Sequence, residues 1–315
     1  MKLLLGLAIL AIGCGGGGGG NADGGGADAP LADASTPTPD AFVPPAGYTN
    51  LIGRDWGLTA GQLDTYKCAR ITVAADTYIT NIIAQAPPGT HHTVLSISDS
   101  STAGPDGVYD CGVGTLGMVM LYASGPGTSP LDFPADVGLK ISAGQQIHLN
   151  LHLFNATDNP LAGHSAILIK SQPTPTPTLA EMVFAGKFFF SIPSNNQPYS
   201  TTGGCTSNRA FKLFALWPHM HQIATHSKFE LVKNGTTQVL HDKPYDFNEQ
   251  TYYRQSPEID VAVGDQIRVT CTWVNNTGQN ITFGDSSNKE MCFTGMYRYP
   301  AVGAGLMECT DNPGF

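Results

Sequence analysis

The chain has 315 residues, a length that suits one large or two medium domains. Only 13% of its residues are charged, and it contains 37 Gly and 22 Pro. Few charges and many turn-forming residues favour an all-β protein over a helical one. Because the formal net charge is −9 and no Lys or Arg cluster occurs, we expect no nucleic-acid partner.

The first 13 residues have the pattern of an export signal peptide. Lys2 precedes an apolar run, residues 3–12, that is too short to cross a bilayer as a helix. The ending AIGC resembles a bacterial lipobox, in which Cys14 would carry the lipid, although the two residues before the Gly depart from the usual pattern. A plain secretory signal with an incidental Cys14 is the alternative. We expect an exported protein, lipid-anchored to the bacterial cell envelope, and Gly15 favours the outer membrane or cell surface.

Residues 14–46 consist mostly of Gly, Ala, Asp and Pro, with almost no large apolar side chains. Such a segment cannot bury enough surface to offset the entropy of ordering it. A structured phosphate-binding loop is disfavoured, because no strand precedes the glycines and no Gly-Lys-Ser/Thr follows them. We predict a flexible tether between the lipid anchor and the folded body.

From residue 47 onward, short apolar alternations recur between turn signals and predict strands. The first group comprises residues 65–75, 78–86, 92–100, 139–144, 146–154 and 165–171. The second comprises residues 182–192, 209–224, 226–235, 236–242, 266–275, 281–285 and 291–299. Between them, residues 172–178 read QPTPTPT, which favours an extended, stiff linker. We predict two tandem antiparallel β-sandwich domains, residues 47–171 and 179–315.

Six cysteines remain besides Cys14, an even number in a chain predicted to be exported. They are Cys68, Cys111, Cys205, Cys271, Cys292 and Cys309. Three disulfides are expected, although six cysteines allow 15 pairings and the sequence alone does not choose among them. Free thiols in a cytosolic protein are the alternative, which the export signal disfavours.

Two histidine pairs occur in the first predicted domain. His91 and His92 are neighbours, and neighbours on a regular strand face opposite ways, so both could bind one ion only where the strand is irregular. The preceding Pro-Pro-Gly supplies such an irregularity. His148 and His152 lie four apart and would share one strand face. Taken alone, these histidines are as easily loop or core residues as metal ligands.

The second predicted domain contains His219-Met220-His221. On a strand, the two histidines would project side by side and Met220 would point into the core. A single His-X-His is a weak signal, and Met291 alone would be interpreted as packing. Acidic residues do not cluster near any histidine, which disfavours a Ca²⁺ or Mg²⁺ site. No serine nucleophile motif, Rossmann fingerprint or phosphate loop is present in the sequence.

Taken in chain order, these motifs resemble the copper type II, ascorbate-dependent monooxygenases, the family of peptidylglycine α-hydroxylating monooxygenase and dopamine β-monooxygenase. The matching stretches are HHTVL, LNLHLFNATDNP, HMH and EMC, with LDTYKCARI near the start, so the similarity covers roughly residues 48–310. The resemblance implies jelly-roll-like sandwiches with a cleft between them. It also implies two copper ions, and hydroxylation of a C–H bond of a small substrate with dioxygen and a one-electron donor such as ascorbate.

The resemblance assigns ligands residue by residue. One copper would lie on the N-terminal set, His91, His92 and His152. The other would lie on the C-terminal set, His219, His221 and Met291, where dioxygen would react beside the substrate. The N-terminal set would supply the second electron. His148 has no matching ligand role.

Ligand chemistry agrees with copper. A thioether favours Cu(I), while imidazole serves both oxidation states. Zinc is the main competitor for three histidines, but methionine is not among its usual ligands, so Met291 shifts the C-terminal set from zinc to copper. The resemblance further implies the disulfides Cys68–Cys111, Cys205–Cys309 and Cys271–Cys292.

Three positions depart from the peptide-processing members of the family. Those members have an Arg two residues before the His-X-His, which helps to bind the substrate carboxylate, whereas this chain has Trp217. They also have Asn and Tyr two and four residues after the Met, whereas this chain has Phe293 and Gly295. We therefore expect a neutral substrate rather than a peptidylglycine, such as an aromatic compound that stacks near Trp217.

Two other functions remain to be compared with the enzyme. A copper-binding lipoprotein on the same fold could capture or store copper without turnover. A β-sandwich adhesion or carbohydrate-binding module would need none of the ordered ligands. The full ligand set favours the enzyme.

Overall fold

The computed structural model describes residues 42–98, 102–113, 118–125, 127–303 and 305–312. Within these ranges all regular elements are β-strands, so the expected all-β class is confirmed. No helix in the described part of the chain is long and apolar enough to cross a membrane. The predicted signal peptide, residues 1–13, and Cys14 lie outside the described residues, as does most of the predicted tether.

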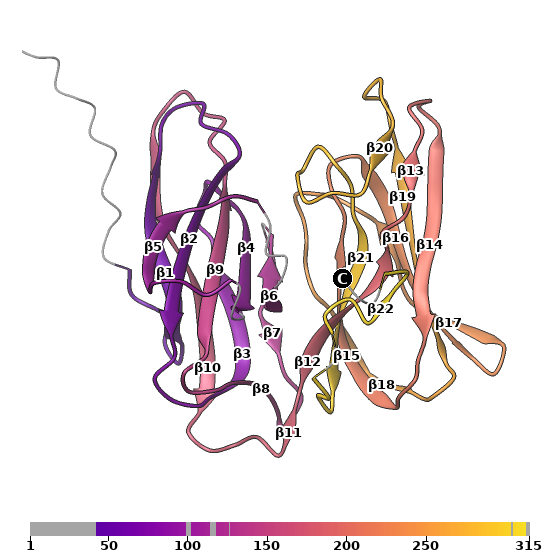
Figure 1. Ribbon diagram of the computed structural model, residues 1–315, viewed down its shortest axis with the longest axis horizontal. Coiled ribbons are helices and arrows are strands. Elements are labelled where there is room, and N and C mark those ends of the chain that lie inside the picture. The colour runs from indigo at the N-terminus through magenta and orange to yellow at the C-terminus, as the bar shows by residue number, and fades with distance from the viewer. Residues whose placement is uncertain (1–41, 99–101, 114–117, 126, 304, 313–315) are drawn as a thin grey trace, which may run out of the picture. The chain divides into compact units, whose positions relative to one another are not determined.

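Ten of the described strands belong to the N-terminal half, residues 42–172 (Figure 1). They are β1 Thr49–Leu58, β2 Thr65–Thr72, β3 Thr77–Gln85, β4 Thr90–Ile97, β5 Gly107–Asp110, β6 Val119–Ser124, β7 Leu131–Asp132, β8 Val137–Ile141, β9 Gln146–Leu153 and β10 Leu161–Gln172. One sheet has the order β5-β2-β9-β4-β6. The other has the order β1-β10-β3-β8, with β7 also paired to β3, and it continues into β11 of the next half.

The other twelve strands that the structure describes belong to the C-terminal half, residues 178–312 (Figure 1). They are β11 Thr178–Leu179, β12 Glu181–Lys187, β13 Ser191–Ile192, β14 Pro198–Thr206, β15 Phe211–His219, β16 Ala224–Lys233, β17 Thr236–Pro244, β18 Tyr253–Val261, β19 Gln266–Val274, β20 Ile281–Thr282, β21 Cys292–Tyr299 and β22 Cys309–Thr310. The sheets have the orders β18-β15-β21-β12-β22, β14-β19-β16-β17 and β13-β20. Pairing is antiparallel except at β8–β11 and β12–β22.

Strand β9 has one apolar face and one polar face, and both are buried. Leu149, Leu151 and Leu153 are fully buried in the hydrophobic core. Because side chains alternate along a strand, His148 and His152 face the other way. Both histidines are nevertheless buried, at 2% and 6% exposure. The fold therefore buries polar side chains. Because such burial is costly unless the groups are paired or bind an ion, it is typical of a functional site.

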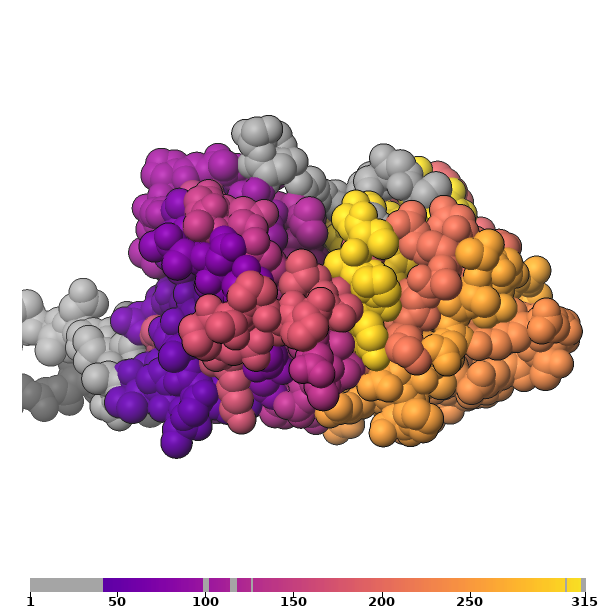
Figure 2. Space-filling model, turned by 90° about the horizontal axis from the view of Figure 1, so that it is seen from below, coloured from indigo at the N-terminus to yellow at the C-terminus, as the bar shows by residue number. Residues whose placement is uncertain are grey.

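The two halves share packing. One hydrophobic cluster includes side chains of both halves, and atoms of both meet on the face in Figure 2. Tyr297 donates a hydrogen bond from its hydroxyl to the carbonyl of Leu121 at 3.1 Å, and Tyr252 contacts both the amide and the carbonyl of Ala123 through its hydroxyl. Strand β6 is thereby fixed to the C-terminal half.

The segment predicted as a linker, residues 172–178, connects two strands. Strand β10 ends at Gln172 and strand β11 begins at Thr178. The intervening segment packs closely, however, because a Cβ atom at Gly138 would lie 2.6 Å from Cγ2 of the buried Thr176. Since residues of both halves belong to one compact unit, the division into domains 47–171 and 179–315 stays a prediction.

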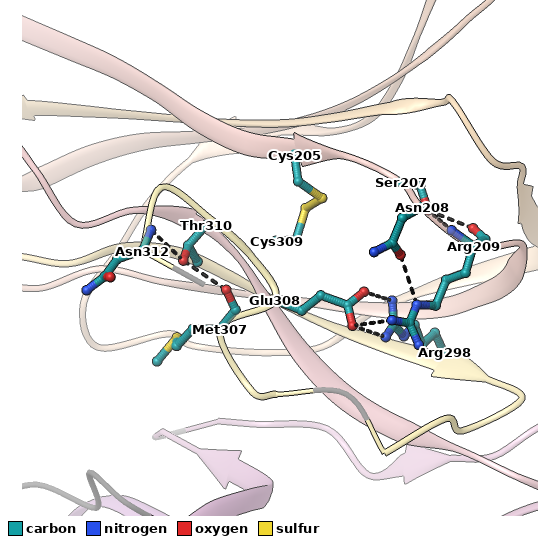
Figure 3. Close-up of a disulfide and its surroundings, with 10 residues drawn as sticks. All are labelled: Cys205, Ser207, Asn208, Arg209, Arg298, Met307, Glu308, Cys309, Thr310 and Asn312. Carbon is teal, nitrogen blue, oxygen red and sulfur yellow. Dashed lines mark hydrogen bonds and ion pairs between the residues drawn. A yellow bond between two sulfur atoms is a disulfide. The ribbon is translucent and has the colours of Figure 1, made fainter. Parts of the chain in front are cut away.

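All three disulfides have the pairing that the resemblance implied. They are Cys68–Cys111, Cys205–Cys309 and Cys271–Cys292. Beside Cys309, Glu308 forms a two-pronged ion pair with the buried Arg298 at 3.0 and 3.1 Å, and Figure 3 shows Met307 on the other side of the same turn. This turn is fixed by a covalent bond and an ion pair, and it brings Met307 to the cavity described below.

Candidate metal centre

The structure brings the predicted N-terminal set together. One potential ligand atom from each of His91, His92 and His152 lies within 4.8 Å of the other two. His91 and His92 follow Thr90, the first residue of β4, and His92 pairs directly with His152 of β9. The register shifts between Thr90 and His92, so the irregularity expected after Pro-Pro-Gly is present and allows adjacent histidines to converge. His148, on the same strand as His152, is not part of this group.

The spacing of the N-terminal set suits a transition-metal ion. Nδ1 of His91 and Nδ1 of His92 are 3.1 Å apart. Two imidazole nitrogens that each lie about 2 Å from one ion are roughly 3 Å apart. His152 is oriented by two neighbours, since its ring stacks on Tyr66 at 4.7 Å and its Nε2 lies 3.0 Å from the carboxylate of Asp64. A carboxylate on the outer nitrogen of a ligand histidine is a common arrangement in metal sites.

The C-terminal set is built differently from the sequence prediction. The ring centroids of His219 and His221 are 5.2 Å apart, and Met220 is fully buried in the core, as expected. However, β15 ends at His219, so His221 does not lie on the strand. Pro218 lies near the end of β15, beyond Leu216, the last residue with a β18 partner. Another element must therefore orient His221.

Glu290 orients the segment that carries His221. Its carboxylate accepts hydrogen bonds from the backbone amides of His221 at 2.9 Å and Ile223 at 3.0 Å, and from the indole of Trp273 at 2.8 Å. Glu290 is fully buried, and burial raises its pKa to about 7. Because Met291 is its immediate neighbour, one side chain links the positions of two predicted ligands.

Met291 and both histidines of the C-terminal set line one cavity of about 490 Å³. His92 and His152 of the N-terminal set line it as well. The rest of the lining is mostly apolar and comes from both halves; it includes Val94, Val119, Met120, Phe184, Phe283 and Phe293. Five of the six predicted ligands, all except His91, thus line an apolar space of ligand size.

Trp217 lies in the wall of this cavity and is 3% exposed. Its ring stacks on His219 at 4.9 Å with an interplanar angle of 10°, so this face of the indole is covered by protein. Its N–H has no hydrogen-bond partner among the described residues. Trp217 therefore orients His219 by stacking and offers one unpaired donor, in addition to any contact with a substrate.

Burial favours the neutral form of the histidines predicted as ligands. It lowers the pKa of His91 and of His219 to about 4 and that of His221 to about 3. The pKa of His92 falls well below its usual value through burial and the neighbouring histidines. Burial also lowers the pKa of His152, against the opposing effect of Asp64. Because neutral imidazole is the form that binds metals, these side chains are suited to ligation near neutral pH.

The hydrogen bonds also select which ring nitrogen remains available to an ion. His221 donates from Nδ1 to the carbonyl of Lys289 at 3.0 Å, so its Nε2 keeps the lone pair. His152 uses Nε2 toward Asp64, which leaves Nδ1. His219 uses Nδ1 toward Gln250 at 2.8 Å, which leaves Nε2.

Gln250 joins the two sets. Its Nε2 lies 2.7 Å from Nε2 of His92, and the ring centroids of His92 and His219 are only 6.2 Å apart. Nearby, the ring of Phe247 lies 4.6 Å from that of His91 and 6.2 Å from that of His221. Gln250 and Phe247 thus each contact residues of both sets.

Sequence reasoning missed three of these residues. The sequence held a signal for Glu290, because it is an acidic residue directly before Met291, where an apolar run begins. Asp64 lies inside the stretch LDTYKCARI but was not singled out. Gln250 left none, since it belongs to an irregular segment before β18 and nothing local marks it.

Two solved structures resemble the fold only weakly. The major capsid protein P2 of bacteriophage PM2 has a TM-score of 0.33 and 8% identity, over 80% of this chain and 99% of that chain. An allantoicase structure has a TM-score of 0.19 and 10% identity, over 70% of this chain and 81% of that chain. Scores this low carry no argument about this protein.

The sequence comparisons are more informative. Residues 179–312 match the family model of the copper type II ascorbate-dependent monooxygenase, C-terminal domain. The human protein named "Putative DBH-like monooxygenase protein 2" is 23% identical over 235 residues, which are 67% of this chain and 47% of that protein. The chain thus spans about half the length of this curated relative. Together these findings support the copper type II ascorbate-dependent monooxygenase family for this chain.

Proposed function

We propose that this protein is a copper-dependent monooxygenase that hydroxylates a C–H bond of a small, neutral, largely apolar substrate. The observation that supports this most is the single cavity lined by members of both ligand sets. The similarity of residues 179–312 to the copper monooxygenase family favours copper over zinc, as does the thioether of Met291.

In this proposal, copper would be held by His91, His92 and His152 and by His219, His221 and Met291. Bound there, copper supplies one-electron transfer and a place for dioxygen to react. The balanced reaction consumes R–H, dioxygen, two electrons and two protons, and it yields R–OH and water. The electrons come from a one-electron donor such as ascorbate.

The chain's own residues would bind and orient the substrate. Phe184, Phe283 and Phe293 form an aromatic part of the cavity wall, and Phe293 packs against Phe184 and Phe283 at 5.5 and 5.8 Å between ring centroids. A Cβ atom at Gly295 would lie 2.4 Å from Cε of Met182, so any side chain there would have to displace the end of Met182. This wall offers no described basic side chain to a carboxylate, so a peptidylglycine is disfavoured.

The test is to load the purified chain with copper and to measure ascorbate-dependent oxygen consumption with small substrates. The panel pairs neutral aromatic and aliphatic compounds with analogues that carry a carboxylate, including a C-terminal glycine peptide. We expect one atom of labelled dioxygen in a neutral product. Efficient hydroxylation of the glycine peptide would contradict the proposed substrate class.

A non-catalytic copper-binding role is the second candidate, because neutral buried histidines and a methionine could also store copper. The same experiment separates the two functions. Two bound coppers with no substrate-stimulated oxygen uptake across the panel would favour storage.

We further propose that the protein is exported and lipid-anchored through Cys14 to the cell envelope. Labelling with a radioactive fatty acid should be lost in Cys14→Ala. Equal labelling of that variant would remove Cys14 from the proposal.

A further inference from the structure

We propose that Gln250 couples the two ligand sets, because its hydrogen bonds to His92 and His219 cannot both persist while both sets hold copper. This inference rests on the proposed function only in requiring that both sets bind copper. It assigns Gln250 as a positioning residue that makes filling of one set weaken the other.

The polarity of the Gln250 amide is fixed by its surroundings. Gln250 is 1% exposed, and its Nε2 lies 3.1 Å from the carbonyl of Phe247. A carbonyl can only accept, so this contact identifies the NH₂ end of the side chain. The same NH₂ group must donate to Nε2 of His92 at 2.7 Å, and Oε1 must accept from Nδ1 of His219 at 2.8 Å.

With these hydrogen bonds, only one of the two histidines that contact Gln250 has its lone pair on the nitrogen that faces the ion. His219 carries its proton on Nδ1, so Nε2 keeps a lone pair for an ion. His92 must accept at Nε2, so the neutral ring carries its proton on Nδ1. Yet Nδ1 of His92 is the atom that lies 3.1 Å from Nδ1 of His91, inside the N-terminal set. A protonated Nδ1 has no lone pair for an ion.

Rotating the amide by a half-turn would only exchange the two roles. Oε1 would then accept from Nε2–H of His92, which frees Nδ1 for copper. The NH₂ group would instead face Nδ1 of His219, which would have to accept and would hold its proton on Nε2. The side-chain amide of Gln250 has one accepting end and one donating end. It can therefore leave the metal-facing nitrogen unprotonated in only one of the two histidines at a time. Filling both sets costs one buried hydrogen bond, equivalent to about three- to tenfold in affinity.

Residues of both halves fix the position of Gln250. Its main-chain carbonyl accepts a hydrogen bond from the hydroxyl of Thr128 in the N-terminal half. A Cβ atom at Gly125 would lie 3.1 Å from Cβ of Gln250 and 3.5 Å from Cδ2 of His92. Glycine at position 125 therefore leaves the space in which the side chain of Gln250 bridges His92 and His219.

The coupling can be measured with Cu(I) as the probe. The full chain is titrated anaerobically against a chromophoric Cu(I) chelator. The affinity of the C-terminal set is compared with the N-terminal set filled and with the N-terminal set disabled by His152→Ala, which leaves His92 and the bridge intact. We expect filling of the N-terminal set to weaken copper binding by the C-terminal set about three- to tenfold in the wild type. This factor is the affinity ratio that the variants below are compared by.

Two substitutions of Gln250 separate coupling from a merely structural role. Gln250→Glu offers two acceptors, one for Nε2–H of His92 and one for Nδ1–H of His219, so filling the N-terminal set should no longer weaken the C-terminal set. Gln250→Leu removes the contacts to both His92 and His219, so the affinity ratio should also be near one. The control Gln279→Glu, in an exposed turn, makes the same charge change and should retain the wild-type ratio.

The outcomes are distinct. A wild-type ratio of one, or the wild-type ratio retained in Gln250→Glu, overturns this inference alone. Fewer than two bound coppers overturns the proposed function together with it. If the variants do not fold, histidine ¹⁵N–¹H spectra of the wild-type chain in chelator decide the point. Protons on the same ring nitrogen of His92 and His219, which is Nδ1 in the arrangement described, support the inference, and protons on different nitrogens of the two rings overturn it.

Discussion

The two ligand sets are held by different parts of the fold. The N-terminal set lies on two directly paired strands, β4 and β9, so backbone hydrogen bonds already bring His92 and His152 together. The C-terminal set combines the end of β15 with two irregular segments, one carrying His221 and one carrying Met291. Strand pairing positions the first set, whereas side chains must position the second.

The supporting carboxylates differ in the same way. Asp64, which contacts His152, has a side chain that is 63% exposed. Glu290, which holds the His221 segment, is fully buried and accepts three hydrogen bonds. A buried acceptor with several donors is costly to remove, while an exposed one is partly replaced by water. The C-terminal set should therefore be the more sensitive to single substitutions.

Met291→Ala should have the largest effect. It removes the only sulfur among the proposed ligands of the C-terminal set, so we expect coupled turnover to fall roughly 100-fold or more. Copper on the N-terminal set should remain, because that set shares no ligand with it. Oxygen consumption with product analysis measures the turnover, and bound copper per chain measures the retention.

Met307→Ala is the matched control, because Met307 lines the same cavity but is carried by the turn that contains Cys309. It should alter the KM of an apolar substrate and leave two coppers bound. If Met307→Ala loses a copper and Met291→Ala does not, the assignment of the sulfur ligand is wrong.

Glu290→Gln should have the next largest effect. An amide presents an NH₂ group to donors that need an acceptor, so we expect a loss of about 1–3 kcal/mol in the free energy of unfolding. The C-terminal set should bind copper roughly 10- to 100-fold more weakly, while the N-terminal set is little changed. Denaturant unfolding and Cu(I) titration measure the two effects.

Glu249→Gln provides the control, since Glu249 is an exposed acidic residue in the neighbouring irregular segment. It should leave both quantities unchanged. An equal loss of affinity at both sets in Glu290→Gln would mean that Glu290 supports the fold generally rather than the C-terminal set.

The sequence predicted the N-terminal set better than the C-terminal set for the same physical reason. Alternation along β9 and the break after Pro-Pro-Gly are local patterns, and they gave the faces of His91, His92 and His152 in advance. His219 and Met220 were also placed well, because they belong to a strand or directly follow it. His221 was not, because its orientation depends on a carboxylate that is distant in the chain.

Local sequence patterns did not predict that Gln250 bridges the two sets. Gln250 is positioned by Phe247 nearby and by Thr128 from the other half. Neither contact follows from periodicity, turn chemistry or a motif. The disulfide pairing was similarly open from spacing alone, and only the family resemblance selected it correctly.

Acid should destabilise the protein through a histidine that lies outside both sets. Burial lowers the pKa of His148 to about 4, against about 6.5 in an unfolded chain. The unfolded chain therefore binds the proton first, so the stability contributed by neutral His148 is complete above pH 6.5 and is lost as the pH falls toward 4. Between pH 6.5 and 5 the loss is about 1.5 kcal/mol. Denaturant unfolding in chelator at these two pH values should show a smaller difference for His148→Phe than for the wild type, and an unchanged difference would contradict the assignment.

Asp64→Asn should have the smallest effect and tests the comparison most directly. The asparagine oxygen can still accept from Nε2–H of His152, and the site is largely exposed, so we expect at most about a threefold loss of copper affinity at the N-terminal set. Asp55→Asn is the control, because Asp55 forms a similar pair with His164 at 2.7 Å, outside both sets. Cu(I) titration of both variants gives the ratio. If Asp64→Asn weakens its set as much as Glu290→Gln weakens the other, strand pairing does not position the N-terminal set, and the exposed carboxylate does so instead.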